Sequence, residues 1–286
     1  MGKVRIVTDS CACIPEPLPD QHRIIVVPYY VHVGADTYRD MVDVRPGPFF
    51  EELARARVLP TTANPGPGDY LEAYRQAAAE GAEAVVSVHM TSAGSGAYQS
   101  AMVGRDMARE QLPGLPIEVV DTRNVAMCHG WVALEAARAC QRGAGLAEVM
   151  DLVRSLLPRV RMIQTADTLR YLFMGGRIGR AQHLMGSLLN VKPLISMEDG
   201  VIVALGQARS RAAAYAQIVQ KMLAEVGAGG RAKVAYLHAA ALDEVARLRR
   251  MLEEVMTPVE TLVAELTPAL GVHTGPGTVG VCYLRL

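Results

Sequence analysis

The stretch AVVSVHMTSAGSGAYQS, residues 84–100, constrains the fold of this chain more than any other. Its valine-rich run predicts a buried strand, Gly94-Ser95-Gly96 predicts a tight turn, and the residues after the turn have the pattern of a helix. Glycine adopts backbone angles that other residues avoid, and the first N–H groups of a helix lack partners within the helix. We therefore expect the Ser95 hydroxyl and the amides of Gly94 and Gly96 to form a site for a negatively charged group.

Short apolar runs alternate with helical patterns in the first half of the chain, which predicts a mainly parallel sheet covered by helices. The expected strands are Val4–Val7, Ile24–Val33 and Ile117–Asp121, in addition to the run at Ala84. Pro28 inside the second strand predicts an edge or a bend. The expected helices are Pro46–Ala56, Pro67–Ala79, Trp131–Cys140 and Leu146–Leu156, and VLPTTANPGPG between the first two is expected to be a loop.

The second half contains an antiparallel element. Two alternating runs flank Glu198-Asp199-Gly200, and Asp-Gly between such runs is typical of a hairpin. Further strands are expected at 160–166, 233–238, 260–266 and 279–286, with helices at 168–174, 212–226 and 241–256. The sequence therefore predicts two α/β domains, residues 1–157 and 158–286, the second with a mixed sheet.

Charge and composition exclude several classes of partner. The 29 basic and 29 acidic residues cancel, so no overall field attracts nucleic acid or an anionic membrane. No apolar run reaches the roughly 18 residues of a membrane span, and MGKVRIVTDS has no signal-peptide pattern, so we expect a cytoplasmic protein without stable membrane insertion. The five cysteines do not suggest a disulfide framework, and Cys11 and Cys13 lack the neighbours of a metal site.

Two enzyme interpretations use the Ser95 turn. A nucleotide-binding turn is possible because Asp121 ends the next strand, although the third glycine of the dinucleotide pattern is missing. The literal G-x-G-x-x-G at 275–280 precedes a strand instead of opening a helix, so it is not such a fingerprint. Ser95, Asp121 and His273 follow the chain order of an α/β-hydrolase triad, but AGSGA is not G-x-S-x-G.

Two further residues have both a functional and an ordinary interpretation. His273 lies in GVHTGPGT, a sequence typical of a loop that can direct a side chain at a ligand, or simply carry a histidine. Gly175-Gly176-Arg177 places an arginine after two glycines, which suits an anionic group or the plain end of a helix.

Several segments together resemble the DegV family of fatty-acid-binding proteins. They are TDS at 8–10, PTTANPGPGDY at 60–70, SAGSGAYQSA at 92–101, DT at 121–122, DTLRYLFMGGRIG at 167–179, LLNVKPLI at 188–195 and HTGPGTVG at 273–280. The resemblance covers essentially the whole chain. It implies a non-catalytic carrier without a cofactor, with a long-chain fatty acid buried between the two domains. In bacteria with a fatty acid kinase, such proteins present the carboxylate for phosphorylation to an acyl-phosphate.

The resemblance also assigns residues. The family's carboxylate ligands fall on Thr62 and Ser95, its loop histidine on His273, and its arginine near the exposed head group, facing the kinase, on Arg177.

This chain departs from the family pattern at a few positions. Ala63 and Ala97 stand where the family often has Ser and Thr, and Cys13 stands where it has an acidic residue. The role of the first loop, with Cys11 and Cys13, is left open.

Overall fold

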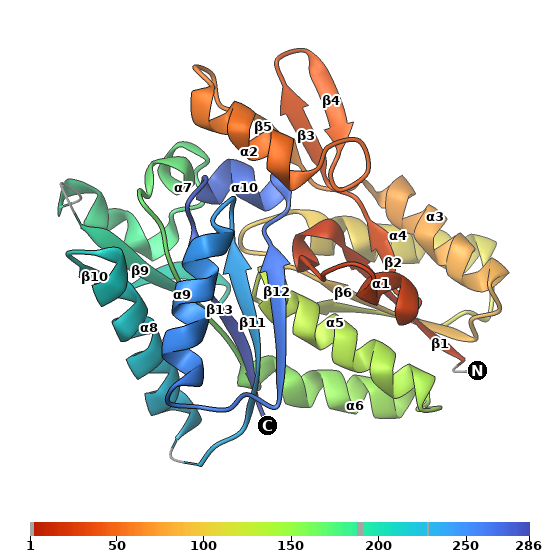
Figure 1. Cartoon of the computed structure of the whole chain (residues 1–286). Helices are drawn as coiled ribbons and strands as arrows, with labels where there is room; N and C mark the ends of the chain where they lie inside the picture. Colours follow the sequence, from red (N-terminus) through yellow and green to blue (C-terminus); the bar gives the residue numbers. More distant parts are fainter. Residues whose placement is uncertain (1–2, 188–190, 228) are drawn as a thin grey trace.

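The first half of the chain forms a parallel sheet with helices on both faces (Figure 1). The computed structural model describes residues 3–187, 191–227 and 229–286. The sheet has the order β2-β1-β6-β7 and consists of β1 (Val4–Asp9), β2 (Ile25–Val27), β6 (Ala84–His89) and β7 (Ile117–Asp121). One face is covered by α3 (Pro67–Ala79) and α4 (Ala97–Gln111), and the other by α5 (Ala126–Gln141) and α6 (Leu146–Leu156). Every residue of β1 and β6 is buried, as expected for strands with helices on both sides.

The second half is built on a six-stranded mixed sheet of order β10-β9-β8-β13-β11-β12. Its strands are β8 (Val160–Thr165), β9 (Lys192–Glu198), β10 (Val201–Ala208), β11 (Ala232–His238), β12 (Glu260–Glu265) and β13 (Val279–Arg285). Only β11 and β12 pair in parallel. Asp199 and Gly200 join β9 to β10 with φ of 52° and 82°, the left-handed angles of a tight hairpin turn. The prediction of one mainly parallel and one mixed α/β unit is confirmed.

The remaining helices cover the mixed sheet or connect it. They are α8 (Arg211–Val226) and α9 (Leu242–Glu253) on one face, and the short α7 (Arg170–Met174), η2 (Leu157–Arg159) and η3 (Gly179–Ser187). The motif LLNVKPLI begins at 188–190, which lie outside the described residues; its later part is the start of β9.

Helix α5 connects the two halves. It packs against β1 of the parallel sheet and β13 of the mixed sheet, and Figure 1 shows it between them. Thirteen of its sixteen residues are buried, and the indole N–H of Trp131 donates to the carbonyl of Cys282 at 3.1 Å. One hydrophobic cluster therefore runs through both halves. The division at residue 157 stays a prediction.

A small third sheet corrects the sequence-based prediction. The expected strand Ile24–Val33 breaks at Pro28 into β2 and β3 (Tyr30–Val33), which belong to different sheets. Strand β3 pairs with β4 (Asp36–Arg39) and with β5 (Thr61–Ala63), which lies in the segment expected to be a loop. Three residues carry too little periodicity to be recognised, and β5 exists because β3 supplies its hydrogen bonds.

Two short helices lie beside this sheet. Helix α2 (Pro46–Arg55) agrees with the prediction, but α10 (Pro268–Thr274) does not. His273 was expected in a loop and instead lies in the last turn of α10. Helix α5 also begins at Ala126, earlier than the expected start at Trp131.

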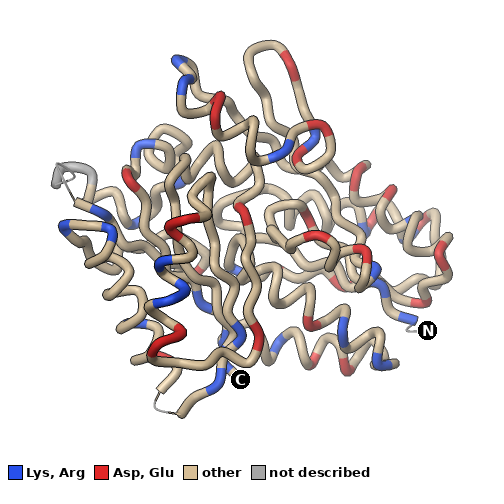
Figure 2. The backbone as a smooth tube through the Cα atoms, viewed as in Figure 1, with Lys and Arg blue, Asp and Glu red and all other residues tan. Residues whose placement is uncertain are grey.

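The surface and the helices fit the charge balance of the sequence. Figure 2 shows basic and acidic residues interspersed along the visible chain. Among the residues that the structure describes, none of the helices is both long and apolar enough to cross a membrane.

Candidate functional site

A cavity of about 230 Å³ lies between the two halves. The first half contributes residues from the first loop, β5 and the Ser95 turn, and the second half contributes β8, β9, α7 and α10. Thr62, Gly94, Ser95, Gly96, Arg177 and His273 all line it. The structure thus brings all the residues assigned to the head group to one cavity, although they lie far apart in the sequence.

The Ser95 turn has the predicted strand, turn and helix, with a partner that the sequence did not reveal. The Ser95 Oγ accepts a hydrogen bond from the Ala97 amide at 3.2 Å and lies 2.7 Å from the hydroxyl of Tyr29. Tyr29 is buried, and burial raises its pKa well above the usual value, so its phenol stays protonated. If Tyr29 donates, both lone pairs of Ser95 are used and its own proton is free for a ligand.

The amides of the turn differ from expectation. The Gly94 N–H already donates to the carbonyl of Thr91 at 3.2 Å, and the Ser95 N–H shares the same acceptor. The Gly96 N–H has no partner within the described residues. Of the two amides expected near the head group, Gly96 is therefore the one that is free to donate.

Thr62 and His273 form the second polar pair of the cavity. Thr62 Oγ1 lies 2.8 Å from His273 Nε2. Burial, together with the positive charge of Arg177, lowers the pKa of His273 to about 4, so the imidazole is neutral near pH 7. The other ring nitrogen, Nδ1, is buried and has no hydrogen-bond partner among the described residues.

Arg177 lies at the exposed side of this pair. Its guanidinium is exposed and donates to the carbonyl of Gly175 at 2.7 Å. A Cβ on residue 175 would collide with Nδ1 of His273, so glycine allows α7 to approach α10. Gly176 has φ of +69°, which suits the turn toward Arg177. The two glycines therefore bring the arginine beside the histidine.

The rest of the cavity wall is mainly apolar. It includes Met90, Met162, Met197, Leu172, Ile202, Leu266 and Leu270. Methionine side chains are flexible and adapt to irregular apolar ligands. Gln164 of β8 also lines the cavity, and no sequence pattern had marked it. The cavity therefore combines hydroxyl, imidazole and guanidinium groups with a long apolar wall.

The first loop supports α10 from the opposite end to His273. In η1 (Ser10–Ala12), the Ser10 hydroxyl donates to Asp40 Oδ2 at 2.6 Å, and Asp40 Oδ1 accepts from the Ala269 amide at 3.0 Å. Asp40 is fully buried, and burial raises its pKa to about 6. The loop that was left without a role thus holds the start of α10.

The two cysteines of this loop are packed inside the protein. Cys11 and Cys13 are both buried, and burial raises the pKa of each thiol. Cys13 has φ of 50° and ends η1, next to α1 (Leu18–Gln21).

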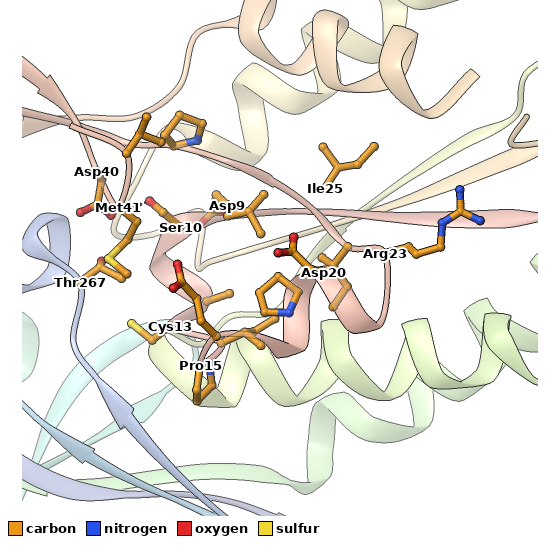
Figure 3. Close-up of a pocket in the computed structure, with 18 of the residues that line it drawn as sticks. Asp9, Ser10, Cys13, Pro15, Asp20, Arg23, Ile25, Asp40, Met41 and Thr267 are labelled. Atoms are coloured by element: carbon orange, nitrogen blue, oxygen red, sulfur yellow. Dashed lines mark hydrogen bonds between the residues drawn. The ribbon is translucent and has the colours of Figure 1, made fainter. Parts of the chain in front are cut away.

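A larger pocket of about 710 Å³ lies beside the same loop, and Figure 3 shows it. Six acidic residues line it: Asp9, Glu16, Asp20, Asp40, Glu80 and Glu265. Three arginines line it as well, and all three form ion pairs with Glu16 or Glu80. The acidic residues outnumber the arginines, so this wall repels a carboxylate, and size alone would select the wrong cavity.

The structure does not bring together the residues that the two enzyme interpretations require. The Asp121 carboxylate accepts hydrogen bonds from the amide and hydroxyl of Ser92 and from the amide of Arg123. Within the described residues, no hydrogen bond joins Asp121, His273 and Ser95, because His273 pairs with Thr62 and Ser95 with Tyr29. The three residues therefore do not form a triad in this structure. Asp121 is also engaged in shaping the turn, which leaves the nucleotide interpretation without its acidic residue.

Comparison with known sequences identifies relatives along the whole chain. The model of the family described as "Uncharacterised protein, DegV family" matches residues 3–286. A DegV domain-containing protein of Streptomyces coelicolor is 34% identical, with 97% of each chain covered. One of Halalkalibacterium halodurans is 32% identical, with 99% of each chain covered.

Several proteins with solved structures of similar fold are described as binding fatty acids. A DegV family protein from Thermus thermophilus, described by its fatty acid binding, has a TM-score of 0.92 and 33% identity, with 99% of each chain covered. DegV of Bacillus subtilis, described as a fatty acid binding protein, has a TM-score of 0.87 and 28% identity, with 99% of each chain covered. A stearic acid-binding protein from Eubacterium ventriosum has a TM-score of 0.88 and 25% identity, covering 99% of this chain and 98% of that one. The chain described above belongs to the DegV family.

Proposed function

We propose that this protein binds one long-chain fatty acid in the cavity between its halves and presents the carboxylate to a fatty acid kinase. The main observation behind the proposal is that the cavity combines a cluster of polar side chains with a mainly apolar wall. Thr62, Ser95, His273 and Arg177 line it together with a mainly apolar wall of methionine and leucine. Relatives described as fatty-acid-binding proteins support the same ligand.

The hydroxyl pairs suit a carboxylate. When the His273 Nε2–H donates to Thr62, the Thr62 proton is free, just as the Ser95 proton is free when Tyr29 donates. Two hydroxyl donors and the Gly96 amide can then bind the two carboxylate oxygens. Each such contact contributes about 1.5–3 kcal/mol, so these residues mainly orient the acid and reject molecules without an acid group.

The acyl chain provides most of the affinity. Burial of about 14 methylenes at ~0.8 kcal/mol each gives roughly 11 kcal/mol, against an association cost of about 4–15 kcal/mol. The apolar wall is therefore as important to binding as the head-group residues.

Mass spectrometry of the lipid released from denatured, purified protein tests the binding step. We expect about one long-chain fatty acid per chain. Ser95→Ala should weaken binding by one lost hydrogen bond, about tenfold, while Ser155→Ala on the exposed face of α6 should not. Protein that carries a nucleotide, or that takes up no acid on incubation, would contradict the proposal.

Transfer to a kinase is tested separately. Arg177 is exposed beside the neutral His273, and a guanidinium there can stabilise the charge that develops on a transferring phosphoryl group. We expect Arg177→Ala to retain most of the affinity for the acid but to lose acyl-phosphate formation with kinase, ATP and Mg²⁺, while His273→Ala impairs both. Arg154→Ala, an exposed arginine on α6, is the control. Transfer by Arg177→Ala at the wild-type rate would remove the arginine from the mechanism.

A further inference from the structure

Gln164 places an unpartnered amide in the cavity wall. Its side chain is 4% exposed, and it makes no hydrogen bond with any residue that the structure describes. Met162 and Met197 line the same cavity. Neither polar atom of this amide is fully enclosed by protein, so both can pair with a group that occupies the cavity.

The register of the sheet fixes the direction of this side chain. Strand β8 lies between β9 and β13, which cover both edges of its backbone, so its contribution to the cavity comes from side chains. Met162 and Gln164 are two residues apart and face the same side, while Ile163 packs into a separate apolar cluster behind the sheet. Gly280 of β13 stands opposite Gln164, and a Cβ there would lie 2.5 Å from the Gln164 Cβ. Glycine at 280 therefore leaves the Gln164 side chain its space.

An unsubstituted acyl chain cannot pair with this amide. The amide offers two N–H donors and a carbonyl acceptor, and a hydroxyl is the small group that can both accept from the one and donate to the other. We infer that the cavity selects an acyl chain that carries a hydroxyl group, bound by Gln164; this inference rests on the proposed fatty acid function. A site that hydrogen-bonds a ligand hydroxyl discriminates against the analogue that lacks it, because the amide is then left unpaired.

Titration calorimetry on delipidated protein tests the preference. The probes are stearic acid and hydroxystearic acids that differ only in the carbon that carries the hydroxyl. We expect at least one hydroxystearic acid to bind about tenfold more tightly than stearic acid, equivalent to about 1.4 kcal/mol. The position of its hydroxyl will report where along the chain Gln164 lies.

Gln164→Met keeps the length of the side chain and removes the amide. This variant should bind stearic acid more tightly than the wild type does and should lose the preference, whereas Ser155→Ala on the exposed face of α6 should keep it. If Gln164→Met does not fold, Gln164→Leu is used as the test variant in its place. Tighter binding of stearic acid than of every hydroxystearic acid by the wild type, or an unchanged preference in Gln164→Met, would overturn the inference. If no acid of either kind binds, the fatty acid proposal fails together with it.

Discussion

Protonation of His273, in α10, and of Asp40, which contacts the start of α10, changes the stability of the fold in opposite directions. His273 has a pKa lowered to about 4 by burial, and Asp40 has a pKa raised to about 6 by burial. The perturbation is removal of one or the other, by His273→Gln or by Asp40→Asn. The property to follow is the difference in unfolding free energy between variant and wild type as a function of pH.

The direction of each change in stability depends on whether the folded or the unfolded chain takes up the proton at the higher pH. As pH falls below 6.5, the unfolded chain protonates His273, but the folded chain does not until about 4, so folding loses at most about 3 kcal/mol at about 1.36 kcal/mol per pH unit. The folded chain protonates Asp40 below about 6 and the unfolded chain only below 3.8, so folding gains at most about 3 kcal/mol over that window. In the wild type the two contributions nearly cancel.

Urea unfolding at about pH 7.5 and about pH 5 exposes each contribution. Relative to the wild type, His273→Gln should gain about 2 kcal/mol between the two conditions and Asp40→Asn should lose about 1 kcal/mol. Ser155→Ala, at an exposed position of α6 without a titratable side chain, is the control and should show no change. If His273→Gln follows the wild type at both pH values, the imidazole is not held neutral and the argument for its role at the head group is wrong.

Three further changes test the packing around the site. Tyr29→Phe leaves the Ser95 hydroxyl without its neighbour, and we expect about fivefold weaker fatty acid binding, measured by titration, because one neutral hydrogen bond of about 1 kcal/mol is lost. Gly271→Ala places a Cβ 2.5 Å from the Phe50 ring and should lower the unfolding free energy by about 1–3 kcal/mol and weaken binding by displacing α10; unaltered affinity would show that α10 need not be fixed. Trp131→Phe removes a fully buried indole and its hydrogen bond, and urea unfolding should show a loss of about 2–3 kcal/mol; a smaller loss would mean that α5 does not hold the halves together.

Elements with local signals were predicted with the bounds that the structure has. The helices Pro67–Ala79 and Leu146–Leu156 are preceded by the N-cap residues Gly66 and Gly145, whose amides donate to Asp69 at 2.7 Å and Glu148 at 2.9 Å. An acidic side chain three residues into a helix is visible in the sequence and needs no distant partner. For such helices, a few neighbouring residues are enough to determine where the helix starts.

The site was predicted only in part for the opposite reason. The turn pattern identified Ser95, but the resemblance to a family, and no local pattern, assigned Thr62. The contacts that orient these residues join Ser95 to Tyr29 across 66 positions and Thr62 to His273 across 211. Gln164 had no signal, because a glutamine in a strand is common and only the register shows that it faces a cavity.

Helix α10 shows why such distant contacts decide the geometry of the site. A helix of seven residues is too short to be stable alone, and its GVHTGPGT end is typical of a loop. Its start is held by the carboxylate of Asp40, 229 positions earlier, and its body packs on Phe50. Because the same helix carries His273 in its last turn, the first loop and Asp40 help to position His273 through α10 without contacting it. The contact between Ser10 and Asp40, which follows β4, therefore links the first loop to the start of this helix.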